Sequence, residues 1–354
     1  MSTKSPSLLM IGSFGFKKGT YGGEDVKNRL LLKSLLNQGC EVNAFDTSGW
    51  RDRPLRVVID LLYTTLTKRS NILLCSHAIG AFRVMPYLIV FKLVFRIKIS
   101  YTVVGYEINN FIEKKPFWIN LLKQLDQIIV ETNMHKGYLE SKGLSNLFYL
   151  SNFRDIRTDV RKKINKARND QLRLIYFTRI DERKPIDRIA EIMEFINSNG
   201  LEEKYLLNIY GKVHKDYKDK FLLRIKDIKN INYQGIIAAN DIRNIMMNHD
   251  LMLYPISAKE DVFPGVLLDA FSGKLPVIAR NSNYISEIIK DNINGYLINT
   301  DEDSRWLAAI EKVRQMQDDE YSNFSESTYN NALQYDTKKV LMRLLELLRK
   351  GGLV

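Results

Sequence analysis

The stretch that decides the fold is KEDVFPGVLLDAFSGKLPVIARNSNYISEIIKDNINGYL, residues 259–297. Its pattern predicts a loop, a short apolar helix over Val266–Phe271 and a strand over Val277–Ala279. Two carboxylates, Asp261 and Asp269, stand eight positions apart around the helix start. Exposed N–H groups at a helix start attract phosphate, and carboxylates accept hydrogen bonds from hydroxyls. The stretch therefore suits a ligand that carries both phosphates and vicinal hydroxyls.

Alternating strand and helix patterns extend this unit along the 354 residues, which is typical of parallel α/β architecture. In the first half, Arg83–Phe95 is one of the predicted helices. A polar and charged segment, Ser151–Asp170, interrupts the alternation and predicts a linker. We therefore expect two Rossmann-like, doubly wound domains facing a cleft, at residues 1–165 and 166–330. A helix in residues 331–354 is expected to pack back on the N-terminal domain.

The segment 259–297 resembles the nucleotide-sugar-binding motif of glycosyltransferase family 4, an acid-x7-acid pattern in enzymes of the GT-B fold. The usual acids are Glu, whereas here both are Asp and Glu260 stands beside the first. The resemblance implies that Asp269 holds the ribose and that Glu260 or Asp261 contacts the donor sugar. Because Pro264 has no N–H, phosphate donation is assigned to Gly265 and Val266. The donor-binding residues predicted in this segment are Glu260, Phe263, Gly265, Val266 and Asp269.

The loop Thr178–Lys184 follows the first predicted strand of the second domain. It resembles a second sequence element of the same family. In the family's Arg-x4-Lys element, both cations hold the donor diphosphate. By position, Arg179 and Lys184 take this role, and together with Asp261 and Glu107 they are the predicted catalytic residues. The departing diphosphate gains negative charge, and enzymes of this fold neutralise it without a metal. The resemblance therefore implies no metal and no cofactor; the alternative for this loop is a solvated charged turn.

Other predicted contacts lie where strands end, because ligands of open α/β sheets bind there. Gly22 and Gly23 stand in a glycine-rich loop before the first helix, where the family commonly carries Gly-Gly. Gly211 and Ile236 follow two strands of the second domain and border the base in the family. Glu107 is placed near the acceptor or the anomeric carbon. Ordinary turns remain the alternative for the glycines, and a structural role is the alternative for His77.

Charge and composition bound the partners. The net charge is +12, and most of this excess lies in residues 1–150, which implies an anionic partner such as a membrane surface. No nucleic-acid-binding motif accompanies it, so nucleic acid is not expected. No uncharged apolar run reaches about 18 residues, and the N-terminus lacks a signal-peptide pattern. Cys40 and Cys75 have the apolar sequence context of reduced core residues; we therefore expect a cytoplasmic protein. The segment RVMPYLIVFKLVFRIK, residues 83–98, predicts either an interfacial helix or a buried one.

The resemblance implies a retaining glycosyltransferase of capsule or O-antigen type in bacterial surface-polysaccharide assembly. Its donor would be a UDP- or GDP-linked sugar, and its acceptor a saccharide, carried on a lipid at the inner face of the membrane. Two other functions stay open from the residues. One is a non-catalytic nucleotide-sugar-binding module of an assembly complex. The other is a nucleotide-sugar epimerase of the same fold, which would need no acceptor.

Overall fold

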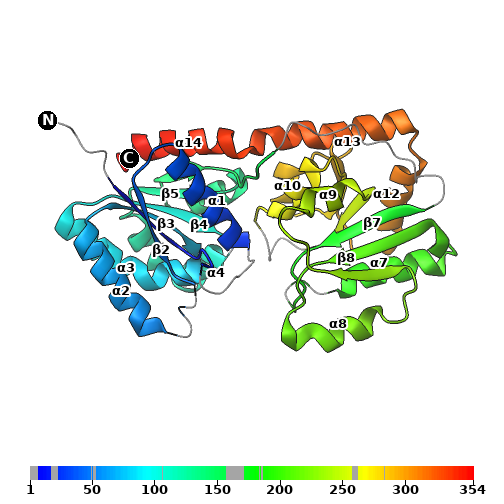
Figure 1. Cartoon of the computed structure of the whole chain (residues 1–354), viewed down its shortest axis with the longest axis horizontal. Helices are drawn as coiled ribbons and strands as arrows, with labels where there is room; N and C mark the ends of the chain where they lie inside the picture. Colours follow the sequence, from blue (N-terminus) through cyan, green and yellow to red (C-terminus); the bar gives the residue numbers. More distant parts are fainter. Residues whose placement is uncertain are drawn as a thin grey trace. The chain divides into compact units, whose positions relative to one another are not determined.

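The computed structural model in Figure 1 describes residues 7–16, 23–48, 50, 53–105, 107–156, 171–182, 184, 186–256, 262–282 and 284–354. It divides the chain into two compact units: Met1–Phe153 with Thr337–Val354, and Arg154–Asp336. Each unit is built around a six-stranded parallel sheet with helices on both faces. The predicted α/β architecture of two doubly wound domains is confirmed.

The sheet of the first unit has the strand order β2-β1-β3-β4-β5-β6. Its strands are β1 (Leu8–Gly12), β2 (Val42–Asp46), β3 (Asn71–His77), β4 (Ile99–Val104), β5 (Gln127–Val130) and β6 (Leu147–Tyr149). Strand β1 is buried on both faces, which explains its unbroken apolar sequence LLMIG. Since β1 pairs with β2 on one side and β3 on the other, the chain reverses direction across the sheet between β1 and β3.

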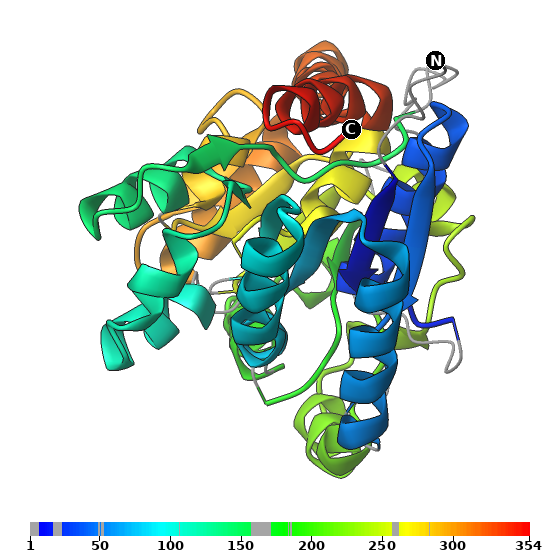
Figure 2. The same ribbon diagram turned by 90° about the vertical axis from the view of Figure 1, so that its left-hand side faces the viewer.

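Alternate side chains of β1 enter two separate hydrophobic cores, because successive strand residues point to opposite faces. Leu9 and Ile11 pack with the helices α2 (Pro54–Lys68), α3 (Ala78–Phe95), α4 (Glu107–Lys114) and α5 (Trp118–Leu122), and with α6 (Asn133–Ser141). Leu8 and Met10 pack with α1 (Gly23–Asn37) and the C-terminal helix α14 (Thr337–Lys350). Figure 2 shows α2 and α3 side by side on their face of the sheet.

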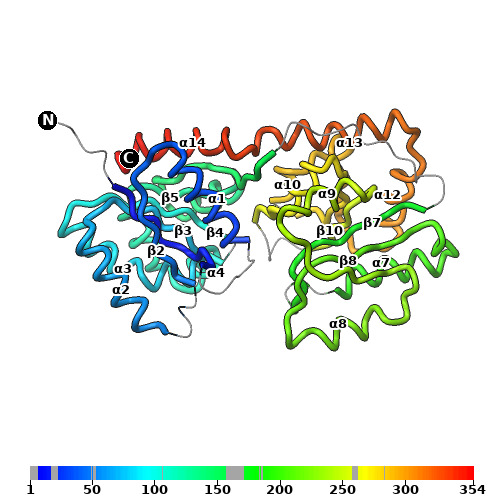
Figure 3. Tube along the Cα trace, in the orientation of Figure 1, coloured from blue at the N-terminus to red at the C-terminus, as the bar shows by residue number. Residues whose placement is uncertain are grey.

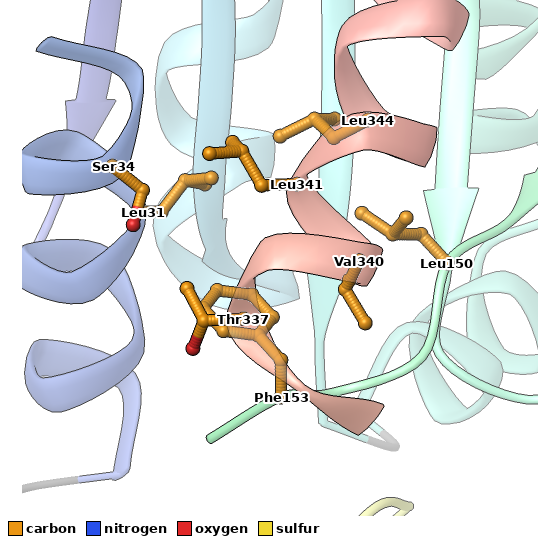
Figure 4. Close-up of a pocket in the computed structure, with 8 residues that line it drawn as sticks. All are labelled: Leu31, Ser34, Leu150, Phe153, Thr337, Val340, Leu341 and Leu344. Carbon is orange, nitrogen blue, oxygen red and sulfur yellow. The ribbon is translucent and has the colours of Figure 1, made fainter. Parts of the chain in front are cut away.

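Helix α14 belongs to the core of the first unit although it comes from the end of the chain. Its side chains Leu341 and Leu344 extend toward Leu31 of α1, whereas Val340 lies on the side of Leu150 and Phe153, as Figure 4 shows. The space among these residues is too small to hold a water molecule. Beyond the helix, Asn71 donates hydrogen bonds to the carbonyl oxygens of Gly352 and Leu353, which fixes the chain end at the start of β3.

The sheet of the second unit has the strand order β12-β11-β10-β7-β8-β9. The path of the chain through this unit can be traced in Figure 3. Its strands are β7 (Leu172–Phe177), β8 (Tyr205–Tyr210), β9 (Ile231–Gly235), β10 (Leu251–Tyr254), β11 (Val277–Arg280) and β12 (Gly295–Ile298). Its α-helices are α7 (Asp187–Ser198), α8 (Lys218–Ile225), α9 (Ile242–Met247), α10 (Gly265–Ser272), α11 (Ile285–Ile288), α12 (Asp303–Gln315) and α13 (Asp318–Ala332). Here the strand order reverses between β7 and β10.

One described helix, α3, is long and apolar enough to cross a bilayer if length and composition alone are considered. Its 18 residues include Arg83 and Lys92, so the run is not free of charge. Its inner side chains, among them Met85 and Leu88, are buried against the sheet. In this structure α3 is therefore a covering helix of an α/β sheet.

Candidate active site

Two loops that carry predicted site residues lie at the strand-order reversal of the second unit. Open α/β sheets bind ligands at such a reversal, beyond the carboxyl ends of their strands. Strands β7 and β10 are parallel neighbours there, with Leu174 paired to Leu251 and Ile175 to Met252. The loop after β7 carries Arg179 and Lys184, and the loop after β10 leads into α10. The fold thus brings the two elements that the sequence singled out to the same edge of one sheet.

Asp181 shapes the loop that carries the two cations. Its carboxylate accepts a hydrogen bond from Arg179 Nε at 2.8 Å and one from the backbone N–H of Lys184 at 3.2 Å. Asp181 is nearly buried, whereas the Arg179 side chain is 48% exposed. The loop is therefore fixed at its turn while the guanidinium stays accessible to a ligand.

Gly211 allows the loop after β8 to lie directly against the loop after β7. Its φ is +134°, and a Cβ added there would lie 1.8 Å from the carbonyl oxygen of Thr178. The backbone N–H of Ile180 donates to Lys212 O at 3.0 Å, and His214 N–H donates to Ile180 O at 2.9 Å. Only a glycine fits at this position, which agrees with the interpretation of Gly211 as a residue of a tight turn. The close backbone packing that it allows holds the loop that carries Arg179.

Helix α10 begins at Gly265, directly after Pro264 in an extended conformation. Among the described side chains, none caps this helix start by a hydrogen bond. Gly265 and Val266 are half-buried, and the apolar residues that follow are buried in the core of the second unit. Their backbone N–H groups belong to the first turn, where an α-helix has no internal partners for its donors, so an anionic ligand would be favoured there.

Asp269 is paired with Arg154, a residue that precedes β7 by 18 positions and belongs to the same unit. Arg154 Nε donates to Asp269 Oδ1 at 2.8 Å, and both side chains are less than a fifth exposed. The Arg154 guanidinium also lies against Gly265, where an added Cβ would come within 1.8 Å of Nη2. Gly265 therefore makes room for a guanidinium beside the start of α10.

Burial and Arg154 act in opposite directions on the pKa of Asp269. Burial raises the pKa of this carboxyl group, while the charge and the hydrogen bond of Arg154 lower it. Burial is the larger effect, so the pKa stays above its usual value. Arg154 therefore opposes the effect of burial and favours the carboxylate form of Asp269, which accepts hydrogen bonds from hydroxyl groups.

The remaining predicted donor residues differ in their surroundings. Phe263 is buried, and its ring packs edge-on against Tyr335 with 5.3 Å between the ring centroids. Ile236 follows β9 and is 62% exposed. Glu260 and Asp261 lie outside the described residues, and so does Gly22 of the first unit. The structure thus places Phe263 in the core that supports α10, and Ile236 at the surface.

In the first unit, His77 is the centre of a small polar cluster at the carboxyl edge of the sheet. It ends β3, and its Nε2 lies 3.0 Å from Glu24 Oε2 while its Nδ1 lies 3.1 Å from the carbonyl oxygen of Val104. Glu107 starts α4 close enough to influence His77 by its charge. Both ring nitrogens face acceptors, so these contacts favour the imidazolium, which donates from both.

The pKa of His77 reflects this cluster. Burial lowers the pKa, but the hydrogen bond and charge of Glu24, together with the charge of Glu107, raise it more, so the pKa lies above its usual value. The neighbouring Gly105 has a φ of +78°, and a Cβ there would lie 3.1 Å from His77 Nδ1. Gly23 opens α1, and a Cβ there would meet nothing within 4 Å.

Replacing Glu24 by glutamine should lower the pKa of His77, because the substitution removes the largest stabiliser of the imidazolium. Titration of the His77 ring protons by NMR measures this directly. Since the folded pKa lies above the unfolded value of about 6.5, the imidazolium stabilises the fold below that pH, and this stability is lost as pH rises through the folded pKa. Glu113→Gln, on the same unit but paired with Tyr138, is the control. Equal His77 titrations in wild type and Glu24→Gln would contradict the assignment.

Three residues that sequence reasoning did not single out shape these sites: Glu24, Arg154 and Asp181. Glu24 directly follows the Gly22-Gly23 pair of the predicted glycine-rich loop, and this position is the sequence signal that points to it. Arg154 stands in the charged segment predicted to be a linker, and the sequence around it contains no signal that it pairs with Asp269, 115 positions later. Among the residues that the structure describes, no three His, Cys, Asp or Glu side chains gather so as to hold a metal ion.

Comparison with known sequences gives two matches. Residues 157–331 match the family model described as Glycosyl transferases group 1. A Klebsiella pneumoniae protein, described as "Uncharacterized 41.2 kDa protein in cps region", is 22% identical over 187 residues. That match covers 51% of this chain and 49% of the relative, so it spans about half the length of the relative.

Solved structures share the architecture of the whole chain. Anabaena HepE, in complex with UDP and glucose, is 15% identical with a TM-score of 0.73 over 98% of this chain and 100% of its own. Sucrose-phosphate synthase from Thermosynechococcus elongatus is 13% identical with a TM-score of 0.79, over 98% of each chain. At these identities the likeness establishes the fold, which is the GT-B fold.

Proposed function

Because the chain contains a Glycosyl transferases group 1 domain over residues 157–331 and has the GT-B fold, we propose that it is a retaining glycosyltransferase. It moves a sugar from a UDP- or GDP-linked donor to a saccharide acceptor. One observation carries the proposal: the loop of Arg179 and Lys184 and the start of α10 with Asp269 lie at the carboxyl ends of neighbouring strands. HepE was solved with UDP-glucose, which supports a nucleotide sugar as donor.

In this proposal, the residues of the second unit stabilise the leaving group. The bond between the anomeric carbon and the phosphate oxygen breaks, and negative charge grows on the diphosphate. Arg179, Lys184 and the N–H groups at the start of α10 offset this charge, which lowers the barrier because the interactions strengthen in the transition state. Asp269 accepts hydrogen bonds from the ribose hydroxyls, and Asp261 or Glu260 orients the sugar.

The acceptor hydroxyl forms the new bond to the anomeric carbon on the face that the diphosphate leaves. Its proton passes to the departing phosphate oxygen, so the products are the glycoside and a nucleoside diphosphate, and the configuration is retained. Glu107 and the residues around Gly23 belong to the acceptor side. The place of the Klebsiella relative in a cps region supports cell-surface polysaccharide as the product. In this proposal the acceptor is linked to a lipid at the inner face of the membrane.

A two-stage experiment tests the proposal. First, thermal shift with UDP-, GDP- and other nucleotide sugars identifies the donor, since a ligand at 100 times its Kd adds about 2.7 kcal/mol of stability. Second, nucleoside diphosphate release is measured with the donor, with and without a membrane extract that contains lipid-linked acceptors, and the anomeric configuration of the product is determined by NMR. Binding without acceptor-dependent release would instead support a binding module, and a changed sugar without acceptor would support an epimerase.

A further inference from the structure

The outer surface of α2 carries large apolar side chains that no other part of the described chain covers. Leu55, Ile59, Tyr63 and Leu66 recur at intervals of three and four residues, which places them on one side of the helix. Leu55 is 79% exposed, and the others are between 48% and 69% exposed. The opposite side of α2, with Leu61 and Thr65, is buried against the sheet.

Helix α3, which covers the same face of the sheet, repeats this arrangement. Tyr87, Val90, Leu93 and Val94 are all at least half exposed, while Leu88 and Ile89 between them are buried. Both helices contribute their inner residues to one core, so their outer sides both point away from the same face of the sheet. We call the eight exposed apolar residues of α2 and α3 the α2–α3 face. Large apolar side chains that gather exposed on one face of a protein mark an interaction site.

Basic residues stand at the ends of both helices. Arg53 and Arg56 lie at the start of α2, Lys68 and Arg69 at its end, and Arg96 directly after α3; all five are exposed. Asp60, the acid on the outer side of α2, lies 3.7 Å from Arg56, and both side chains are more than half exposed, so this pair stays open to solvent. Other nearby cations are used inside the fold: Lys92 pairs with Asp126 at 2.7 Å, and Lys98 donates to the carbonyl oxygen of Gly351. The charge available to a partner thus lies around the α2–α3 face.

We propose that the α2–α3 face docks on an anionic lipid bilayer, with its apolar side chains at the boundary of headgroups and acyl chains. The basic residues then meet the lipid phosphates, to which each contributes when close to the surface. Tyr63 and Tyr87 fit the same place, because tyrosine rings with a polar tip favour the membrane interface. This docking proposal rests on the proposed function in one respect: a lipid-linked acceptor would be held in the same bilayer.

Two other arrangements fit the surface less well. In a symmetric pair of copies, the same face would meet itself, so the basic rims of the two copies would lie together and repel. A bilayer carries the opposite charge and avoids this. Insertion of α3 across the bilayer would expose the sheet that its inner side chains cover, whereas docking along the helix leaves the core of the first unit intact.

The test uses co-sedimentation of the full chain with vesicles of phosphatidylcholine alone, or with a third of phosphatidylglycerol. Leu93→Gln/Val94→Gln and Leu55→Gln/Ile59→Gln remove apolar contact from each helix, and Arg56→Gln/Arg96→Gln removes charge. The matched control is Leu222→Gln/Leu223→Gln, an adjacent and exposed leucine pair on α8 of the other unit. Each apolar variant should bind anionic vesicles about tenfold more weakly than wild type or more. The control should bind as wild type does.

Wild type should bind neutral vesicles much less than anionic ones. Its binding to anionic vesicles should weaken as salt rises, because added salt shortens the range of the attraction to about 10 Å at 0.1 M. Nucleotide binding, measured by calorimetry on the same proteins, separates this proposal from the proposed function: the face variants should bind nucleotide as wild type does. The docking proposal would be overturned by face variants that bind vesicles like the control. A wild-type dimer that dissociates in Leu93→Gln/Val94→Gln, detected by light scattering, would also overturn it and assign the face to a second copy.

Discussion

Alanine at Arg179 or at Lys184 should lower the turnover of donor and acceptor by about 100-fold or more, with a smaller effect on the melting temperature. Both cations belong to the loop after β7, and the Arg179 side chain is half exposed at the sheet edge where the diphosphate is expected. Their charge is needed most when the donor bond breaks, because the leaving diphosphate then carries its largest charge. Loss of one preorganised donor of this kind costs about 100- to 1,000-fold in kcat.

A control from the same unit separates this effect from general loss of positive charge. Arg305 lies on α12, is 71% exposed and pairs at 3.6 Å with Glu302, the residue before the helix, so Arg305→Ala should leave turnover unchanged. Initial rates of nucleoside diphosphate release, with and without a chelator, provide the measurement. Wild-type turnover in both Arg179→Ala and Lys184→Ala would refute the assignment. So would strict dependence on a divalent metal, which would then be the group that offsets the charge.

Much of the fold could be predicted because apolar periodicity records burial directly. Strands buried on both faces, such as β1, have continuous apolar sequences, and Gly and Pro mark the turns between elements. The start of α3 could not be predicted in this way. Arg83 was expected to begin this helix, but it begins at Ala78. The segment Ala78–Phe82 contains Gly80 and small residues with a weak helical pattern, and its helix forms because Ala78, Ala81 and Phe82 pack on the sheet.

Two parts of the candidate site, the loop with Arg179 and Lys184 and the start of α10, could be located from the sequence. Each is a short local motif that follows a predicted strand. Pairings across long sequence separations could not be predicted. Asp269 and Arg154 stand 115 positions apart, and a single sequence gives no signal that they meet. Glu24 and His77 meet because β1 and β3 are neighbours, which depends on the strand order rather than on either local sequence. Conversely, Gly211 and Phe263 matched a family pattern, and the structure gives both a role in packing.

Asp269→Asn should weaken the binding of the bare nucleoside diphosphate by about 10- to 100-fold, whereas Asp261→Asn should spare it and impair transfer. Hydrogen bonds to a charged acceptor contribute about 1.5–3 kcal/mol, and an amide oxygen replaces only part of this. Calorimetry with UDP and GDP measures the affinity directly. Unchanged nucleotide affinity in Asp269→Asn would rule out its assignment to the ribose.

The pairing with Arg154 adds a pH dependence that a purely structural role of Asp269 would not produce. Burial already raises the pKa of Asp269, and removal of Arg154 takes away the charge that opposes this rise. In Arg154→Gln the Asp269 carboxylate should therefore take up its proton at a higher pH than in wild type. As the pH is lowered, nucleotide affinity should begin to fall at a correspondingly higher pH. Arg154→Lys restores the positive charge but not the planar, two-pronged guanidinium. The pH at which nucleotide affinity falls should therefore lie between those of wild type and Arg154→Gln.

The comparison with Asp269→Asn makes this expectation specific. An asparagine does not titrate, so the pH-dependent fall should be absent both from Asp269→Asn and from the double variant with Arg154→Gln. The double variant should bind nucleotide about as weakly as Asp269→Asn alone, because residues that act through one contact are not additive. Arg224→Gln is the control, since it breaks another arginine–carboxylate pair of the same unit, with Glu194, on α8 and α7. An Arg154→Gln variant whose affinity follows the wild-type pH profile would mean that Arg154 does not set the charge of Asp269.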